Sequence, residues 1–123
     1  MNYKKYQFDC IPSTQDFLRE KRAKGENAVA VAKSQSGGKG TKGRSFSSNE
    51  GGVYLTKLDF YTDFPAKNAF KIMANTAVAV CETLRSFGVA PVIKWPNDIH
   101  VNGKKICGIL IENTFSGANI SSS

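Results

Sequence analysis

Two stretches of the chain concentrate the residue types that bind anionic ligands. Residues 35–52 (QSGGKGTKGRSFSSNEGG) hold six glycines and three basic side chains but no aliphatic residue. Residues 94–110 (KWPNDIHVNGKKICGIL) combine lysines, an amide, a carboxylate and glycines. Glycine lets backbone N–H groups approach a ligand closely, and Lys or Arg supplies positive charge. We therefore hypothesise that residues 35–52 form an anion-binding loop, with a solvated Gly/Ser linker as the alternative.

The glycine spacing of this loop matches two nucleotide-binding motifs whose structural context is missing. Gly38 to Gly43 fits G-x-G-x-x-G, and the same segment with Arg44 and Ser45 is one residue from a Walker A motif. Both motifs need a helix directly after the loop, whereas the residues that follow favour a strand. The glycine loop of protein kinases lies between strands, but the later kinase motifs are absent from this sequence. An anion cradle of another kind, set between two strands, remains.

The second stretch is typical of a bent hairpin that carries charged groups. Pro96 and Asn97 interrupt a strand, and Asn102-Gly103 is a strong two-residue turn signal of type I′. Asp98 can hold Mg²⁺ directly or through water, and lysines can neutralise phosphate oxygens. A surface hairpin with ordinary lysines is the alternative, and the Trp-Pro-Asn-Asp break makes it less favourable.

The elements around these two stretches must position them. Apolar and alternating runs predict strands at 3–11, 28–33, 52–60, 91–95, 98–101 and 104–112, with the second central in a sheet and the last buried on both faces. In the third strand, Val53, Leu55 and, after a slip, Leu58 are expected to point inward. Helices are predicted from Ser13 or Thr14 to residue 24 and from Pro65 to residue 87. After Asn113 only an undeveloped strand at 119–120 is expected. This order predicts an α+β (α/β) fold, with a mixed β-sheet flanked by helices.

Composition and charge limit the class of protein. The 123 residues predict a single domain, 1–123, of soluble globular composition. No apolar run is long enough to span a bilayer and no signal-peptide pattern is visible, so a cytoplasmic protein is expected. Three separated cysteines and the single His100 disfavour a disulfide framework or a zinc site. The net charge of +7 suggests an anionic partner, and a diffusely basic surface without specific meaning is the alternative.

The motifs taken together resemble the catalytic domain of biotin protein ligases, which share a superfamily with lipoate ligases. The family pattern runs S-T-[NQ], then Q-x-x-G-[RK]-G-x-x-G-R-x-[WF], then K-W-P-N-D, then G-x-K-[LIV]-x-G-I-L-x-E. These motifs stand here as Ser13-Thr14-Gln15, Gln35 to Phe46, Lys94 to Asp98, and Gly103 to Glu112. The resemblance covers about residues 3–115, and its last two motifs are the most specific.

The resemblance implies ATP-dependent activation of biotin to biotinoyl-5′-AMP and transfer to a lysine of a biotin carboxyl carrier domain, such as that of acetyl-CoA carboxylase. It implies biotin, ATP and Mg²⁺ as ligands. Lys105, Arg44 and Asp98 would be catalytic, with Lys105 at the reacting carboxyl and α-phosphate, and with Asp98 placing Mg²⁺ or orienting Lys105. Phe46 stands where Trp is usual and would pack between biotin and adenine. The implied binding residues are Ser13, Thr14, Gln15, Gln35, Gly38, Lys39, Gly40, Gly43, Arg44, Phe46, Trp95, Asn97, Lys105 and Gly108.

The departures from the family pattern lead to further expectations. Family catalytic domains continue well past such a hairpin, so we expect a truncated domain without the N-terminal DNA-binding domain or the C-terminal β-barrel. We therefore expect no nucleic-acid binding, and weak biotin binding or dependence on a partner chain. No membrane binding is expected either, because no apolar run is long enough to span a bilayer. A homodimer is left open. Thr41 stands where Arg or Lys is frequent. The loop from Gly38 to Asn49 is expected to be mobile without ligand.

Two other readings stay open within this superfamily, and one lies outside it. The first is a lipoate or octanoyl ligase or transferase. The second is a non-catalytic fragment that only binds biotin or its adenylate. A nucleic-acid-binding module is a weaker alternative, because it rests on net charge alone.

Overall fold

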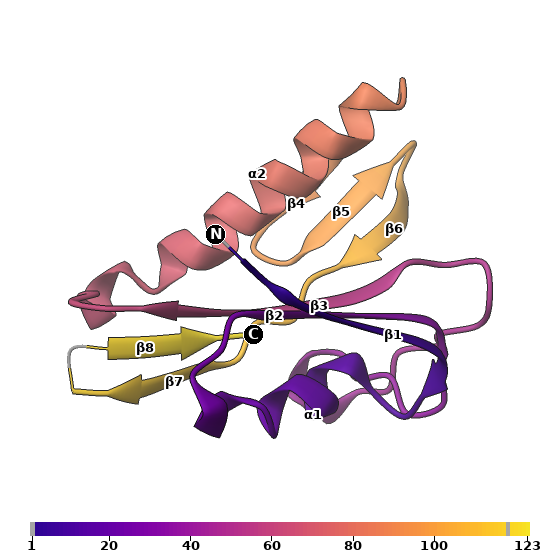
Figure 1. Cartoon of the computed structure of the whole chain (residues 1–123). Helices are drawn as coiled ribbons and strands as arrows, with labels where there is room; N and C mark the ends of the chain where they lie inside the picture. The colour runs from indigo at the N-terminus through magenta and orange to yellow at the C-terminus, as the bar shows by residue number, and fades with distance from the viewer. Residues whose placement is uncertain (1, 118) are drawn as a thin grey trace. The chain divides into compact units, whose positions relative to one another are not determined.

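A five-stranded mixed sheet, in the order β1-β2-β3-β8-β7, organises the first of two units in this computed structural model. The structure describes residues 2–117 and 119–123. The first unit runs up to Phe64 and resumes at Glu112, and the second unit comprises Pro65–Ile111. Mixed strand pairing and flanking helices confirm the predicted fold class (Figure 1). No helix in the described part of the chain is both long and apolar enough to cross a membrane.

The first unit begins with a parallel strand–helix–strand segment. Strand β1 (Lys4–Ile11) pairs in parallel with β2 (Ala28–Gln35), and α1 (Thr14–Arg19) connects them. The predicted helix to residue 24 divides into α1 and the 3₁₀ turn η1 (Arg22–Lys24), which ends at Gly25 with a φ of 66°. Strand β3 (Tyr54–Tyr61) is antiparallel to β2, which leaves β2 in the interior of the sheet as predicted.

The core of the first unit lies between α1 and one face of this sheet. Leu18 of α1 packs with Ala28, Ala30 and Leu58, all almost fully buried. The Phe17 ring makes T-shaped contacts with Tyr6 and Phe8, with ring centroids 4.9 Å apart in both pairs. The small alanines of β2 give the helix room to approach.

The predicted inward face of β3 is wrong at two positions. Val53 lies before the strand and is exposed, and Leu55 is more than half exposed. Thr56 and Leu58 are buried, because the register pairs them with Ala30 and Ala28 on the face that α1 covers. A shift of one residue moves every side chain of a strand to the opposite face.

The end of the chain forms a hairpin that the sequence did not predict. Strand β7 (Asn113–Ser116) pairs with β8 (Asn119–Ser122), and β8 pairs with β3. Ile120, the one apolar residue of β8, is almost fully buried. The expectation that no strand develops here is therefore wrong: pairing with β3 and burial of Ile120 outweigh the weak strand propensity of serine and asparagine.

The second unit packs a long helix on a small antiparallel sheet. A 3₁₀ turn, η3 (Ala66–Asn68), precedes α2 (Phe70–Ser86), whose Ala77 and Cys81 are buried. The helix contacts β4 (Val92–Lys94) and β5 (Asp98–Val101), and β6 (Lys104–Gly108) completes the sheet (Figure 1).

The hairpin between β5 and β6 bears out one prediction and contradicts another. Asn102 and Gly103 have φ values of 53° and 76°, the positive pair that a type I′ turn requires. The predicted strand 104–112 ends at Gly108, and β6 is largely exposed rather than buried on both faces. The reason is that β6 is the edge strand of a three-stranded sheet.

Candidate functional site

The base of the glycine loop is fastened by backbone hydrogen bonds between its two arms. The Gln35 N–H donates to the Ser48 carbonyl at 2.9 Å, and the Phe46 N–H donates to the Gly38 carbonyl at 2.8 Å. Gly38 itself is buried, and a Cβ there would meet the Phe46 carbonyl oxygen and Ser48 Oγ. Only glycine therefore fits at this point of the motif.

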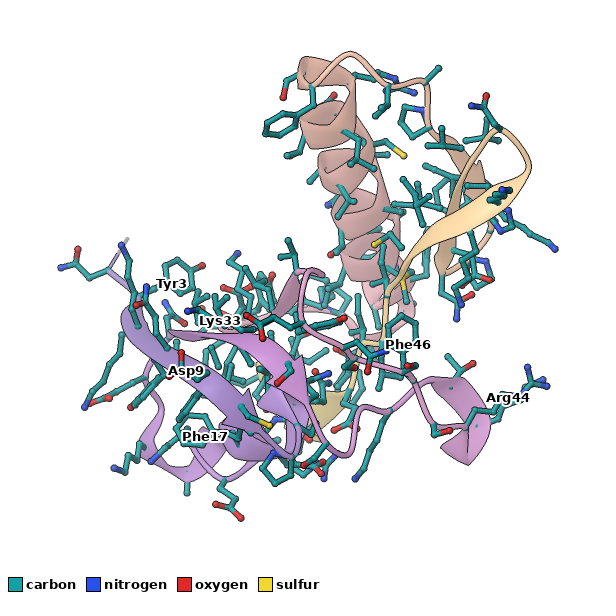
Figure 2. All side chains as sticks on the ribbon, turned by 90° about the vertical axis from the view of Figure 1, so that its right-hand side faces the viewer. Tyr3, Asp9, Phe17, Lys33, Arg44 and Phe46 are labelled. Atoms are coloured by element: carbon teal, nitrogen blue, oxygen red, sulfur yellow. The ribbon has the colours of Figure 1, made fainter. Side chains whose placement is uncertain are left out.

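The tip of the loop is short and exposed. The Gly40 N–H donates to the Arg44 carbonyl at 2.7 Å, which closes a turn around η2 (Thr41–Gly43). Lys42 and Gly43 have positive φ values of 57° and 72°. The Arg44 side chain is exposed and extends outward from this turn (Figure 2). The tip thus carries positive charge, and Gly40 and Gly43 add no side chain that would cover its backbone.

A polar network lies under the loop and joins two predicted site residues. The Thr14 N–H and hydroxyl both donate to Gln35 Oε1, at 2.8 and 3.1 Å. Gln35 Nε2 donates in turn to Ser48 Oγ at 3.0 Å. The Thr14 and Thr56 hydroxyl oxygens are buried and lie 2.8 Å apart. Sequence reasoning missed Ser48 and Thr56. Thr56 reaches Thr14 only because of the register of β3, and Ser48 reaches Gln35 only because backbone hydrogen bonds join the two arms of the loop.

The other two residues of the Ser-Thr-Gln motif are held by the protein itself. Ser13 Oγ accepts a hydrogen bond from the Asp16 N–H at 3.2 Å and so caps α1. Gln15 Nε2 donates to the Ser123 carbonyl at 2.7 Å, and Gln15 Oε1 accepts from Thr56 Oγ1 at 3.3 Å. Both residues are buried and fix the start of α1 beneath the loop. Their contact with a ligand stays a prediction.

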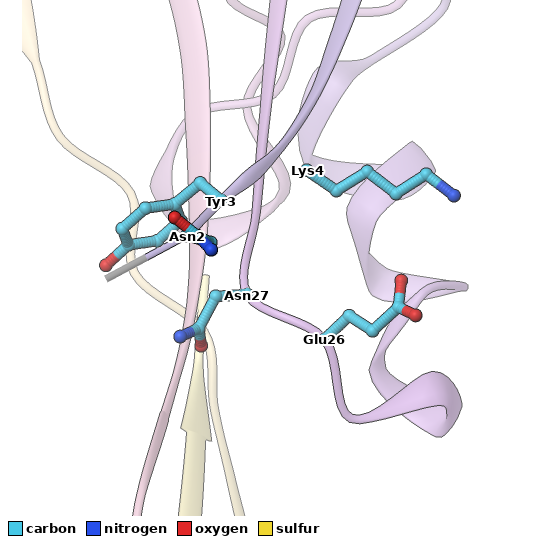
Figure 3. A pocket seen from close by; sticks show the side chains of 5 residues that line it. All are labelled: Asn2, Tyr3, Lys4, Glu26 and Asn27. Carbon is cyan, nitrogen blue, oxygen red and sulfur yellow. The ribbon is translucent and has the colours of Figure 1, made fainter.

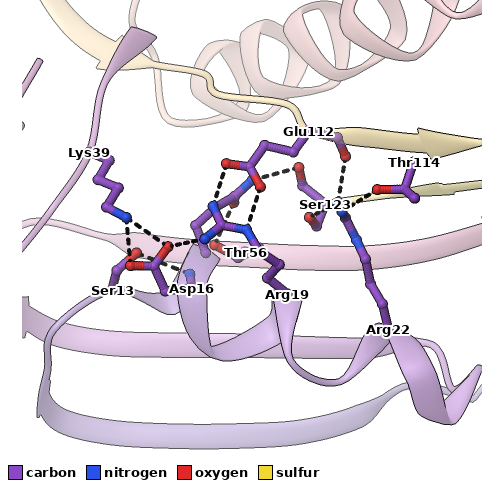
Figure 4. Close-up of polar contacts among 10 residues, drawn as sticks. Ser13, Asp16, Arg19, Arg22, Lys39, Thr56, Glu112, Thr114 and Ser123 are labelled. Carbon is purple, nitrogen blue, oxygen red and sulfur yellow. Dashed lines mark hydrogen bonds and ion pairs between the residues drawn. The ribbon is translucent and has the colours of Figure 1, made fainter. Parts of the chain in front are cut away.

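A line of alternating charges connects the loop to the end of the chain (Figure 4). Lys39 Nζ lies 2.8 Å from Asp16 Oδ2, and Asp16 Oδ1 lies 2.8 Å from Arg19 Nη1. Arg19 then binds Glu112 through Nε and Nη2, at 3.0 and 2.6 Å. The hydrogen bond from Lys39, supported by the charges of Lys39 and Arg19 and opposed by partial burial, lowers the pKa of Asp16. No sequence signal singled out Asp16 or Arg19.

The second predicted stretch forms a charged pair on the hairpin of the second unit. Lys105 Nζ lies 3.0 Å from Asp98 Oδ1, and Asp98 is paired across the ladder with Gly108. The Asn97 carbonyl accepts a hydrogen bond from the Ile109 N–H at 2.9 Å, which fixes the chain directly before Asp98. Trp95 precedes a cis peptide bond to Pro96 and is largely exposed. The structure thus places the Lys105 ammonium against the Asp98 carboxylate, with Asn97 next to Asp98 in the chain and Gly108 opposite it in the ladder. Contact of these residues with a ligand stays a prediction.

The residues described do not by themselves form a magnesium site. No group of three His, Cys, Asp or Glu side chains gathers anywhere in residues 2–117 and 119–123. The Asp98 carboxylate faces the Lys105 ammonium, which competes with a cation for the same oxygen. The assignment of Mg²⁺ to Asp98 stays a prediction.

A separate open hollow of about 400 Å³ lies beside the first strand (Figure 3). It is lined by Asn2, Tyr3, Lys4, Glu26 and Asn27, and none of the predicted site residues reaches it. We assign no function to this hollow.

Comparison with known proteins finds a family model and several relatives that match this chain. Residues 7–121 match the model of the biotin/lipoate A/B protein ligase family. The bifunctional ligase/repressor BirA of Bacillus subtilis is 36% identical over 107 residues, which cover 85% of this chain and 33% of the relative. The biotin–[acetyl-CoA-carboxylase] ligase of Paracoccus denitrificans is 29% identical over 103 residues, 76% of this chain and 40% of the relative.

A solved structure agrees with this grouping. The biotin protein ligase of Leishmania major in complex with biotinyl-5-AMP superposes with a TM-score of 0.75 at 27% identity. The match covers 99% of this chain and 56% of that one. The chain therefore spans well under two thirds of the length of these three relatives.

Proposed function

This chain belongs to the biotin/lipoate A/B protein ligase family, and we propose that it takes part in ATP-dependent formation of biotinoyl-5′-AMP and transfer of biotin to a carrier lysine. Two of its relatives are named as biotin ligases, one of them in complex with biotinyl-5-AMP, and a third is named a bifunctional ligase/repressor. We further propose the biotin carboxyl carrier domain of a carboxylase as acceptor and the cytoplasm as location. No binding to nucleic acid is proposed.

The observation that carries this proposal is the Lys105–Asp98 pair on the hairpin. Its 3.0 Å separation gives the flexible lysine side chain a defined direction. The hydrogen bond between Asn97 and Ile109 fixes the backbone beside it. A rigid support for a single positive charge is what electrostatic catalysis at a phosphate requires.

The proposed chemistry needs charge neutralisation and alignment rather than an enzyme nucleophile. A biotin carboxylate oxygen attacks the α-phosphorus of ATP, forming the acyl–phosphate bond and releasing pyrophosphate. The uncharged amine of the carrier lysine then attacks the acyl carbon, and AMP leaves. In both steps negative charge gathers around the α-phosphate, where we propose that Lys105 acts, with Asp98 orienting it. Such preorganised charge lowers the barrier most when it is already in position.

The first unit contributes the binding groups in this proposal. Its glycine loop offers backbone N–H groups, Lys39 and Arg44 to the adenylate, and Phe46 an aromatic surface. The Thr14–Gln35 pair and Ser13, which lie under the loop, are proposed to meet the ring end of biotin. These roles rest on the family motif together with the geometry of the loop.

The test is biotin-dependent exchange between ATP and pyrophosphate, compared between Lys105→Ala and Lys104→Ala. Loss of the Lys105 charge should reduce exchange at least about a hundredfold, in line with the removal of one group that stabilises the transition state. Lys104 is a matched control, because it is also exposed and precedes Lys105 on the same strand. Its loss should change exchange by less than about twofold, as expected for an exposed surface charge.

Three outcomes separate the proposal from its alternatives. Equal activity of the two variants would remove Lys105 from its role. Binding of biotin by calorimetry without any exchange in the wild-type chain would favour a non-catalytic binding module. If exchange depends on lipoate or octanoate instead of biotin, the substrate is one of these acids and the assignment of biotin is wrong.

A further inference from the structure

Ion pairs connect Glu112, Arg19, Asp16 and Lys39 in that order. The last of these residues, Lys39, belongs to the glycine loop and directly follows Gly38. We propose that Asp16 is a positioning residue, which acts through Lys39 to hold the loop in the arrangement that binds the adenylate. Arg19 and Glu112 fix Asp16 in turn. The inference rests on the proposed function for the identity of the ligand, whereas the holding of the loop is a property of the chain itself.

The geometry defines two points of attachment for the loop. Gly38 is tied to Phe46 through the backbone, and the next residue, Lys39, is tied to α1 through its side chain. The Lys39 ammonium contacts both Asp16 oxygens, at 2.8 and 3.0 Å. The tip from Gly40 to Arg44 therefore follows directly after two residues, Gly38 and Lys39, that are held in place.

Asp16 is itself held more firmly than a surface carboxylate on its own helix would be. Arg19 lies one turn further along α1 and binds Asp16 while making two hydrogen bonds to Glu112. Those bonds to Glu112, supported by the charges of Glu112 and Asp16 and opposed by partial burial, raise the pKa of the Arg19 guanidinium. Glu112 in turn exchanges two backbone hydrogen bonds with Ser123, at 2.8 and 3.0 Å. The position of Lys39 thus depends on a chain of contacts that ends in the sheet.

Neutralising Asp16 should loosen the loop without unfolding the unit. The Asp16 and Lys39 side chains are 36% and 48% exposed, so their pair contributes as a partly screened ion pair. We expect Asp16→Asn to raise the rate of trypsin cleavage after Lys42 and Arg44 about threefold, in keeping with the loss of such pairs. Asp16→Glu keeps the charge and should restore most of the protection.

The matched control is Asp9→Asn. Asp9 also forms an ion pair with a lysine, Lys33, across β1 and β2 at 3.5 Å (Figure 2), and both residues lie outside the loop of residues 35–52. Cleavage products are identified by mass spectrometry, and urea unfolding of each variant confirms that it is folded. Raising the salt concentration should reduce the difference between wild type and Asp16→Asn, because screening weakens exposed pairs. A purely steric role of Asp16 would leave that difference unchanged.

Calorimetric titration with biotinoyl-5′-AMP supplies the second readout. Asp16→Asn should weaken its binding about threefold, as the loss of one partly screened pair predicts. If Asp16→Asn is cleaved no faster than Asp9→Asn, the positioning role is wrong. If cleavage rises but affinity for biotinoyl-5′-AMP is unchanged, Asp16 holds the loop without serving the ligand, which also overturns the proposal. If the wild-type chain binds no biotinoyl-5′-AMP, the proposed function fails, and the cleavage rates alone decide whether Asp16 holds the loop.

Discussion

At Gly38, the lack of a side chain is a steric requirement of the loop base. A Cβ would meet the Phe46 carbonyl oxygen, Ser48 Oγ and, at 3.1 Å, Gln35 Nε2. All three groups are joined by hydrogen bonds, because Ser48 Oγ donates to the Phe46 carbonyl and accepts from Gln35 Nε2, so they cannot move without breaking these bonds. Gly40 differs: a Cβ there would make only ordinary contacts with Arg44, at 3.7 and 3.9 Å.

Gly38→Ala should therefore destabilise the first unit, whereas Gly40→Ala should not. We expect a loss of about 1–3 kcal/mol for Gly38→Ala, the usual cost of forcing extra volume into a packed site. The midpoint of urea unfolding, monitored by circular dichroism, measures both variants. Equal unfolding midpoints for the two variants would mean that the loop base accommodates the Cβ at residue 38 without a loss of stability, which would contradict this prediction.

Residue pairs close in sequence were easier to predict than pairs joined by tertiary structure. The Lys105–Asp98 pair lies on a hairpin whose turn, Asn102-Gly103, is a local signal that the sequence alone predicts. The Asp16–Lys39 pair and the contacts of Ser48 and Thr56 need the packing of α1 against the loop and sheet. No local pattern marks such residues, because each is an ordinary polar side chain until the fold assembles.

Among the elements, the positions of β1 and β2 and the turn between β5 and β6 were predicted well, whereas the burial of β6, the inward face of β3 and the final hairpin were not. The alternating alanines of β2 and the strand–turn–strand pattern of β5 and β6 are local signals. The face of β3 depends on its register against β2, which a single strand cannot define. The hairpin of β7 and β8 depends on a partner strand, β3, more than 50 residues away in the sequence.

Because the final hairpin depends on pairing with β3, we expect the buried side chain of Ile120 to contribute most of its stability. Ile120→Ala should lower the free energy of unfolding by about 2–4 kcal/mol, as for other buried aliphatic residues cut back to alanine. Phe115, on β7, pairs with Ile120 in the ladder but is 46% exposed, and Phe115→Ala should cost less than half as much. Urea unfolding measures both. A smaller effect for Ile120 than for Phe115 would contradict the burial of β8 against β3.

At the scale of the whole molecule, the first unit is built from two segments of the chain that the second unit separates. Residues near both ends of the described chain meet in it: Arg22 donates hydrogen bonds to Thr114 Oγ1, the Glu112 carbonyl and Ser123 Oγ (Figure 4). The helix and hairpin of the second unit lie between these segments in sequence. The prediction of one domain spanning 1–123 stays a prediction, which cooperative unfolding of the two units would support.

The three cysteines report on the two units separately. Cys10 is exposed on β1, Cys81 is buried in α2, and Cys107 on β6 is partly buried. Burial, together with the nearby Cys81, raises the pKa of the Cys107 thiol. A raised pKa leaves less thiolate at a given pH, so Cys107 should react more slowly than its exposure alone implies. We expect a disulfide reagent at pH 8 to label Cys10 rapidly, Cys107 more slowly and Cys81 only when the second unit opens.

Cys10→Ser should therefore remove the fast phase and leave the slow ones. The rate at Cys107 should still be rising above the pH at which an ordinary cysteine thiol is ionised, because burial raises the pKa of the Cys107 thiol. Labelling of Cys81 in increasing urea then measures the opening of the second unit, and circular dichroism measures the loss of the whole fold. Opening of the second unit before that loss would establish two independently stable units. Coincident transitions would establish one cooperative domain, and labelling of Cys81 as fast as Cys10 without urea would contradict the packing of α2.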